Sequence, residues 1–467
     1  MAFNSLAYLL FLPLAVLIYY ACPGKIRPYV LLAFSYFFYA FADWRLSFLI
    51  LLTTLTSYLG GLLVERCPKE WMRRLVLIVS VGFSLSVLFV FKYLNFVIVS
   101  IDKIGSFFQQ DLSIRTLDIL LPVGISFYTF QTLSYVVDVY RKDVSPVRNF
   151  FHYALFVSFF PQLVAGPIER VDHLLPQLLE AKRFESQNLV KASRYLVMGY
   201  VKKIVIADIL SVFVDSVFAS LSLASGASIL LAAFFFYGQI YADFSGYCDI
   251  AKGSAYLFSI ELMDNFDKPY LSSSMSQFFR RWHVSLDLWF RDYLYVPLGG
   301  NRKGKFRQIL AVLLVFFCSG LWHGADWTFV IWGLYCGFIV ALEILFGHRR
   351  RNPYLFVPLT FLLVTVSWIF FRCQSIEDIG TCFVRIFTSF TTGNGFEAFQ
   401  NTSYLIFALL SLFLLPFVDS LPRLADAKGE LSVSSLALYT GLIALVVVSG
   451  FYLAKSDYGG GFIYFQF

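Results

Sequence analysis

The chain has 467 residues, of which 58% are hydrophobic, 19% aromatic and only 14% charged, and its net charge at pH 7 is +7. Soluble domains carry about 25% charged residues, so this composition excludes an ordinary soluble fold and favours a chain that presents apolar side chains to lipid. The basic residues cluster in short loops, which argues against nucleic-acid binding and is typical of the cytoplasmic loops of membrane proteins.

Apolar windows follow one another along the chain and predict roughly 11 to 13 membrane segments, because a span needs about 20 apolar residues. We expect an all-α polytopic fold that forms one membrane domain over residues 1–467. The first window lacks a basic leader and a small-residue cleavage site, so we interpret it as a retained span. The windows lie near residues 6–20, 29–42, 47–64, 75–100, 119–137, 150–165, 195–219, 228–244, 308–322, 327–346, 355–371, 402–418 and 436–453, and the shorter ones are expected to be re-entrant.

The basic loops predict the orientation of the chain. The loop at 21–28 and the loop at 65–74 are both rich in Lys and Arg, and two crossings separate them. We therefore place both in the cytoplasm and the N-terminus outside it. The basic stretches at 302–307 and 349–351 should also face the cytoplasm.

Two apolar runs are interrupted by proline and glycine, at residues 122–124 and at residues 160–168. Such breaks at membrane depth are tolerated where protein or a water-filled cavity satisfies the freed backbone groups. The alternative interpretation is a helix that simply ends at the membrane interface.

A polar cluster at residues 241–253 lies between apolar runs and contains Asp243, Ser245, Tyr247 and Asp249, with Lys252 nearby. Charges inside a membrane segment are costly and are usually paired. The two aspartates could be paired structurally or could line a substrate path. We favour the structural pairing and keep the four residues as path candidates, together with Asp326.

Residues 278–294 predict an amphipathic helix with a dense ionic face. At 3.6 residues per turn, Arg280, Asp287 and Arg291 share one stripe, with His283 at its edge. His283 and Asp287 are four residues apart, so the carboxylate could reach the imidazole. We expect these charges to pair, to lie at the interface or to line an aqueous cavity. The alternative is an interfacial helix on the cytoplasmic leaflet.

His323 lies in a short break between two apolar helices, within the stretch SGLWHGADW. Glycines near the histidine allow backbone or substrate to approach closely, and Trp322 and Trp327 could wall the site. Imidazole is the side chain best suited to exchange protons near neutral pH, and an ionisable group inside a membrane indicates function. The alternative is a histidine that is hydrogen-bonded within the bundle.

Common catalytic motifs are absent from the sequence. It has no Walker A loop, no H-E-x-x-H, no G-x-S-x-G and no dinucleotide fingerprint, and its seven cysteines form no C-x-x-C pair. We therefore expect neither a bound metal nor a bound cofactor.

The motifs resemble those of the membrane-bound O-acyltransferases, and within them the alginate O-acetyltransferase type of bacterial polysaccharide acetylase. By this resemblance, the family's essential histidine corresponds to His323 and its second recurrent histidine to His283. The resemblance also implies a ring of helices around a thinned centre, with a funnel that admits the donor from the cytoplasm and the acceptor from outside. The matching stretches are PVGISFYTFQ (122–131), FPQLVAGPI (160–168), YADFSGYCDI (241–250), RRWHVSLDLWFRDYLYVPLGG (280–300), LWHG (321–324) and FIYFQF (462–467).

The expected function is therefore acyl transfer in a bacterial cell membrane, from acetyl-CoA or another acyl thioester. His323 would act as general base or carry the acyl group, and His283 would be oriented by Asp287, with Arg280, Arg291 and Trp322 in support. The resemblance implies an extracytoplasmic, esterase-like acetyltransferase partner and the polysaccharide synthesis machinery. The polymer stays open between alginate, cellulose and a wall glycan. The alternatives are D-alanyl transfer to teichoic acid and a transporter or scaffold without catalysis.

Overall fold

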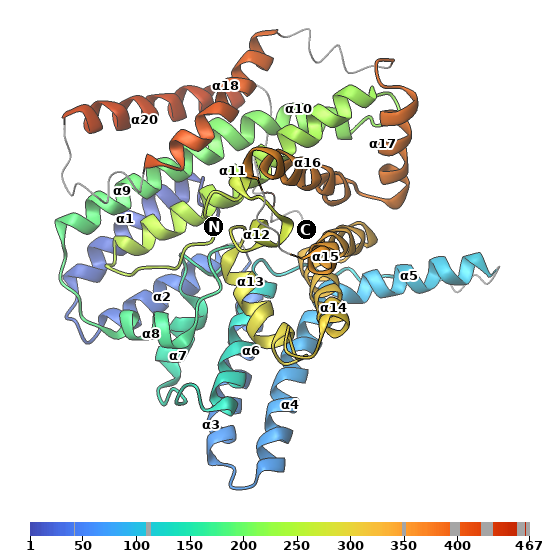
Figure 1. The fold of residues 1–467 in the computed structure, drawn as a ribbon. Coiled ribbons are helices and arrows are strands. Elements are labelled where there is room, and N and C mark those ends of the chain that lie inside the picture. Colours follow the sequence, from blue (N-terminus) through green and yellow to red (C-terminus); the bar gives the residue numbers. More distant parts are fainter. Residues whose placement is uncertain are drawn as a thin grey trace. The chain divides into compact units, whose positions relative to one another are not determined.

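A computed structural model describes residues 1–41, 43–108, 114–347, 352–392, 402–421, 433–454 and 463 (Figure 1). These residues are helical apart from turns and loops, and the strand pairing among them is one antiparallel bridge, between Phe266 and Trp282. The expected all-helical class is confirmed. The chain divides into two compact units, which we call unit 1 (Met1–Glu185 with Ser254–Met263) and unit 2 (Ser186–Gly253 with Asp264–Phe467).

The helices of unit 1 follow one another along the first 179 residues. They are α1 (Leu6–Ala21), α2 (Arg27–Ala40), α3 (Leu46–Arg66), α4 (Glu70–Leu88), the π-helical turn η1 (Phe89–Tyr93), α5 (Leu94–Phe107), α6 (Ile125–Arg141), α7 (Phe150–Ser158) and α8 (Val171–Leu179).

Unit 2 contains the later helices, with the last turn of α11 running into unit 1. They are α9 (Ser186–Tyr200), the π-helical turn η2 (Val201–Ala207), α10 (Asp208–Phe218), α11 (Gly226–Tyr256), the 3₁₀ turn η3 (Pro269–Leu271), α12 (Met275–Phe279), α13 (Val284–Phe290), the π-helical turn η4 (Arg291–Tyr295), α14 (Lys305–His323), α15 (Trp327–Phe346), α16 (Pro353–Arg372), α17 (Ile376–Thr388), α18 (Thr402–Val418) and α20 (Val433–Ala454).

Six helical segments in the described part of the chain are long and apolar enough to cross a membrane, so the chain is a polytopic membrane protein. Three shorter apolar helices accompany them, at Leu6–Ala21, Leu405–Val418 and Ala437–Phe451. The expected ring and funnel stay predictions. The six segments are Leu46–Arg66, Glu70–Phe107, Gly226–Tyr256, Lys305–His323, Trp327–Phe346 and Pro353–Arg372.

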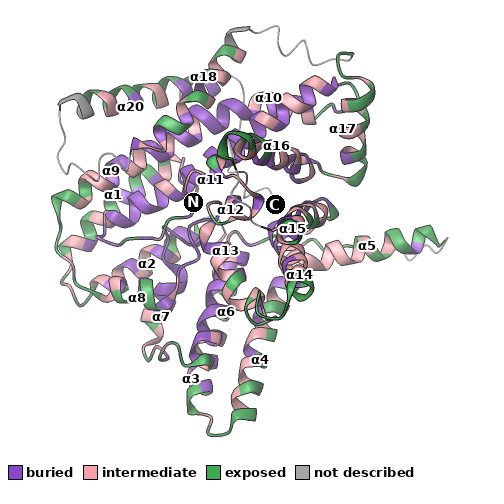
Figure 2. Ribbon diagram, in the orientation of Figure 1, coloured by how far each residue is buried: buried purple, intermediate pink, exposed green. Residues whose placement is uncertain are grey.

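The long helix α11 is the most buried of these segments, with 78% of its apolar window inside the protein against 22% for the segment Glu70–Phe107 (Figure 2). A helix covered by other helices does not need to be apolar on every side. This burial explains how α11 accommodates the polar cluster at 241–253 within an apolar helix.

Helices α14 and α15 pack closely where glycines face the partner backbone. A Cβ atom on Gly320 would lie 2.4 Å from the carbonyl oxygen of Phe329, and one on Gly333 would lie 2.3 Å from that of Phe316. Only glycine permits such an approach. This packing holds the end of α14, where His323 lies, directly against α15.

Candidate active site

The break around His323 has the predicted form. His323 is the last residue of α14, and Gly324 to Asp326 connect it to α15. The Asp326 carboxylate accepts a hydrogen bond of 2.9 Å from the Thr328 N–H, so this residue caps α15. Capping accounts for the presence of Asp326, and its place on a substrate path stays a prediction.

Aromatic rings surround the His323 imidazole, which is only 6% exposed. The ring centroids of Trp322 and Trp332 each lie 5.0 Å from that of His323, and Phe371 of α16 lies at 5.5 Å. The expected wall residue Trp327 is instead 43% exposed at the start of α15. Trp332, about one and a half turns further along α15, packs against the His323 imidazole instead, and the sequence did not reveal this contact.

His283 joins this cluster from the loop between α12 and α13, and it is 2% exposed. Its ring centroid lies 4.8 Å from Phe244, 5.5 Å from Trp322 and 6.5 Å from His323. Burial lowers the pKa of His283 to about 3, so its imidazole is neutral at physiological pH. Two histidines 40 positions apart in sequence thus lie in one aromatic environment.

The prediction of one continuous helix over 278–294 is wrong. Helix α12 ends at Phe279, His283 adopts left-handed backbone angles (φ 50°, ψ 54°), and α13 starts at Val284. The backbone of Trp282 pairs with Phe266, which interrupts the helical hydrogen bonding. The kink turns His283 away from the ionic stripe, so the single-helix geometry does not apply to it.

The three charges of the stripe still lie together, because Arg280, Asp287 and Arg291 line one cavity of about 450 Å³. Its other walls are mainly apolar and include Phe279, Val315, Phe316 and Ile344. Of the three expected settings for these charges, the structure shows a cavity, and its aqueous character stays a prediction.

The carboxyl of Asp287 interacts with the charges of Arg280 and Arg291. Burial raises the pKa of its carboxyl to about 6, and the charges of Arg280 and Arg291 oppose this shift. The Arg291 Nε donates to the neighbouring Asp292 at 2.8 Å. A hydrogen bond of 3.1 Å from the Asp287 N–H to the His283 carbonyl joins the two backbones. An orienting role for the Asp287 carboxylate toward the imidazole stays a prediction.

The aspartates of α11 are paired, as favoured, but with lysines that the sequence analysis overlooked. The Lys203 Nζ donates to Asp243 at 2.6 Å, and the Lys202 Nζ lies 2.7 Å from Asp249. Both lysines are buried in the π-helical turn η2. Lys252, the expected partner, binds Asp264 instead.

A small polar cavity of about 150 Å³ lies beside these ion pairs, and Ser245 and Asp249 are among its lining residues. Tyr247 is buried on the same helix at 2% exposure. The role of these residues in a substrate path stays a prediction.

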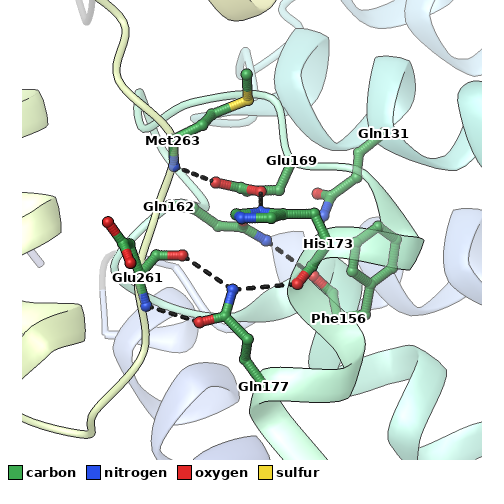
Figure 3. Close-up of polar contacts among 8 residues, drawn as sticks. All are labelled: Gln131, Phe156, Gln162, Glu169, His173, Gln177, Glu261 and Met263. Atoms are coloured by element: carbon green, nitrogen blue, oxygen red, sulfur yellow. Dashed lines mark hydrogen bonds and ion pairs between the residues drawn. The ribbon is translucent and has the colours of Figure 1, made fainter.

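In unit 1, side chains next to the break at 160–168 form a cluster of hydrogen bonds, which we call the hub (Figure 3). Its side chains are those of Gln131, Gln162, Glu169 and His173. The Glu169 carboxylate is fully buried, and it accepts the Met263 N–H at 2.7 Å and bonds the His173 Nδ1 at 2.6 Å. Gln131 and Gln162 both donate to the Phe156 carbonyl oxygen, at 3.0 and 2.9 Å. The two glutamine side chains thus satisfy a carbonyl near the end of α7, beside the break, and the position of the break at membrane depth stays a prediction.

Residues 141–376 match the model of the membrane-bound O-acyltransferase family, and this range includes His283 and His323. The chain belongs to this family. It is also 36% identical over 497 aligned residues to a probable alginate O-acetylase AlgI of Pseudomonas putida, with both chains fully covered.

Two further relatives broaden the comparison. A peptidoglycan O-acetyltransferase of Helicobacter pylori is 34% identical over 74% of this chain and 70% of its own length. A teichoic acid D-alanyltransferase of Streptococcus thermophilus is 28% identical over 49% of this chain and 58% of its own length. The chain is therefore a membrane O-acyltransferase that is related to alginate and peptidoglycan O-acetylating enzymes.

Proposed function

We propose that this chain transfers an acetyl group from a thioester donor such as acetyl-CoA, for the O-acetylation of an extracytoplasmic polysaccharide. The observation that carries the proposal is the pair of buried imidazoles, His283 and His323, whose ring centroids lie 6.5 Å apart. The O-acetylating relatives, matched over most of the chain, favour acetyl over D-alanyl transfer, for which the match covers half of the chain.

In the proposed reaction, His323 acts as the general base. Its imidazole takes the proton of an acceptor hydroxyl while the hydroxyl oxygen attacks the thioester carbonyl carbon. The carbon–sulfur bond then breaks, and the leaving thiolate takes the proton back from the imidazolium. His283, which is neutral, positions the reacting groups by hydrogen bonding. The surrounding rings exclude water, which would otherwise hydrolyse the thioester.

The cavity beside Arg280 and Arg291 is the proposed donor site. Guanidinium groups pair well with phosphate, and the apolar walls suit the arm and acyl chain of an acyl thioester. Aromatic rings connect this cavity to His323, because the ring centroid of its wall residue Phe279 lies 6.1 Å from that of Trp332, which lies 5.0 Å from that of His323.

The acetyl group would pass to an esterase-like acetyltransferase partner outside the cytoplasm, which then modifies the polymer alongside the synthesis machinery. We place the protein in a bacterial cell membrane, with the N-terminus outside, on the basis of the basic loops. A single cysteine introduced at Lys25 should react with an impermeant maleimide only after the membrane is opened. Labelling in intact cells would reverse this orientation.

Thioester turnover by the purified protein tests the proposed chemistry. Acetyl-CoA should lose its acetyl group to an added hydroxyl acceptor, and H323A should abolish this turnover while the protein remains folded. A turnover equal to that of the parent in H323A would remove the proposed role, and trapping of an acetylated His323 would replace the base mechanism with acyl transfer through the imidazole.

A further inference from the structure

The backbone at His283 requires support from outside its own helix. Its left-handed conformation is uncommon for a residue with a side chain and persists only where the surrounding structure imposes it. His283 is also the N-cap residue of α13, yet its side chain makes no capping hydrogen bond. The first N–H groups of α13 therefore need acceptors from another segment.

Asn265 supplies these acceptors. Its backbone carbonyl accepts the Val284 N–H at 3.0 Å, and its side-chain Oδ1 accepts the Ser285 N–H at 3.1 Å. Asn265 is 2% exposed, and its Nδ2 donates to the Cys248 Sγ of α11 at 3.5 Å. One residue thus holds the two peptide groups that follow His283 and ties them to α11.

We infer that Asn265 is a positioning residue for His283, acting as an N-cap supplied from a separate segment. A residue at the N-cap normally uses its own side chain to accept the N–H groups of the first turn. Because Asn265 does this instead, the His283 imidazole is directed toward Phe244, Trp322 and His323. The asparagine therefore sets where the second histidine lies.

Neighbouring contacts extend the clamp. The Asp267 N–H donates to the Arg281 carbonyl at 3.0 Å, and Phe266 pairs with Trp282 as an antiparallel bridge. The His283 carbonyl in turn accepts the Leu286 N–H at 3.0 Å. Residues 265–267 thus run beside the His283 loop, and the Asn265 side chain adds a hydrogen bond to these contacts.

The inference rests on the proposed role of His283, and the test compares N265L, N265D and C248A in the purified full-length protein, with acetyl-CoA as donor. Leucine is similar in size to asparagine but cannot accept the Ser285 N–H, whereas aspartate keeps the accepting oxygen. A displacement of a catalytic group by about 1 Å can cost about 100-fold in rate. We expect N265L to lower kcat by about 10- to 100-fold, with KM for acetyl-CoA changed by less than about 2-fold.

N265D should restore kcat to within about 3-fold of the parent, because aspartate and asparagine cap helices about equally well. C248A removes the other partner of the side chain and should stay within about 2-fold of the parent. A folded N265L with the parent kcat, or a folded N265D as impaired as N265L, overturns the inference. Should N265L fail to fold, the folded N265D and C248A decide: parent-like kcat in both supports the clamp, and a loss in either overturns it.

H283A separates this inference from the proposed function. An inactive H283A combined with a fully active, folded N265L would leave the histidine role intact and remove the clamp. A fully active H283A would remove the proposed role of His283 itself, whatever the behaviour of the Asn265 variants.

Discussion

Two breaks in apolar helices, one in each unit, use their polar residues differently. At the unit 1 hub, the Glu169 carboxylate and the amides of Gln131 and Gln162 bind backbone groups, so the polar atoms maintain the shape of the chain. At the unit 2 break, aromatic rings surround His323, and the ring centroid of His283 lies 6.5 Å from that of His323. One break therefore maintains the shape of the chain, and the other carries the proposed chemistry. Substitutions should therefore affect stability at the first site and turnover at the second.

The largest effect is expected for H323A. General acid–base catalysis contributes about 10²- to 10⁴-fold, so kcat for acetyl transfer should fall by about that factor while the melting temperature changes little. H173A is a matched control, because it removes the half-exposed histidine of the hub, and it should retain the parent kcat. Equal losses of activity in the two variants would erase the distinction between the two breaks.

The reverse pattern is expected for E169A. Hydrogen bonds to charged groups contribute about 1.5–3 kcal/mol, and Glu169 makes two such contacts at full burial, so the free energy of unfolding should fall by about 2–3 kcal/mol. The activity of the protein that remains folded should be unchanged. E180A is the control, since Glu180 forms an exposed ion pair that contributes less than about 1 kcal/mol. Thermal unfolding in detergent measures both, and an E169A that unfolds like E180A would contradict the structural role of the hub.

A smaller effect is expected at the proposed donor site. The pKa of Asp287 is raised to about 6 by burial, so the carboxyl is ionised at pH 7 and offsets the charges of Arg280 and Arg291. D287N should lower KM for the anionic acetyl-CoA by about 2- to 5-fold at pH 7, because removing one charge changes a partly exposed interaction by about 1 kcal/mol or less.

The parent protein should approach the KM of D287N as the pH falls below about 6, where its own carboxyl is protonated. Measuring KM against pH for both proteins checks this. A pH-independent difference between them would show that the charge of Asp287 does not act on the donor.

The sequence predicts the elements that depend on local pattern. Apolar composition indicates the membrane class, and proline and glycine mark the breaks at 160–168 and beside His323. The break marks His323, whereas helical periodicity places His283 at the edge of an ionic stripe, and the family resemblance links the two. The helix proposed for 278–294 is nevertheless interrupted at His283, by pairing with a segment that periodicity does not reveal.

Tertiary partners could not be predicted in the same way. The partners of the α11 aspartates, Lys203 and Lys202, lie 40 and 47 residues upstream within an apolar run, where their charge is the one available signal. Trp332 and Asn265 carry no local signal, because an aromatic residue in an apolar helix and an asparagine in a loop are ordinary. Their roles depend on which segments pack together.

The smallest effect is expected from the titration of His173. Its hydrogen bond to Glu169 raises the pKa of the imidazole, and burial opposes this shift. A raised pKa in the folded state means that the contact contributes fully below the unfolded value of about 6.5 and is lost as the pH rises through the folded value. The His173 side chain is 47% exposed, so solvent screening limits this contribution to less than about 1 kcal/mol.

H173Q is the matched variant, because glutamine can donate to Glu169 but does not titrate. The stability advantage of the parent over H173Q should therefore be greatest near pH 6 and should vanish above the folded pKa of His173, and added salt should reduce it. Unfolding temperatures at several pH values measure the difference. Because the hub lies apart in sequence from His283 and His323, the histidines of the proposed mechanism, kcat should not follow the same pH dependence. A shared profile would mean that the protonation of His173 reaches the chemistry, and the division of roles between the two breaks would have to be abandoned.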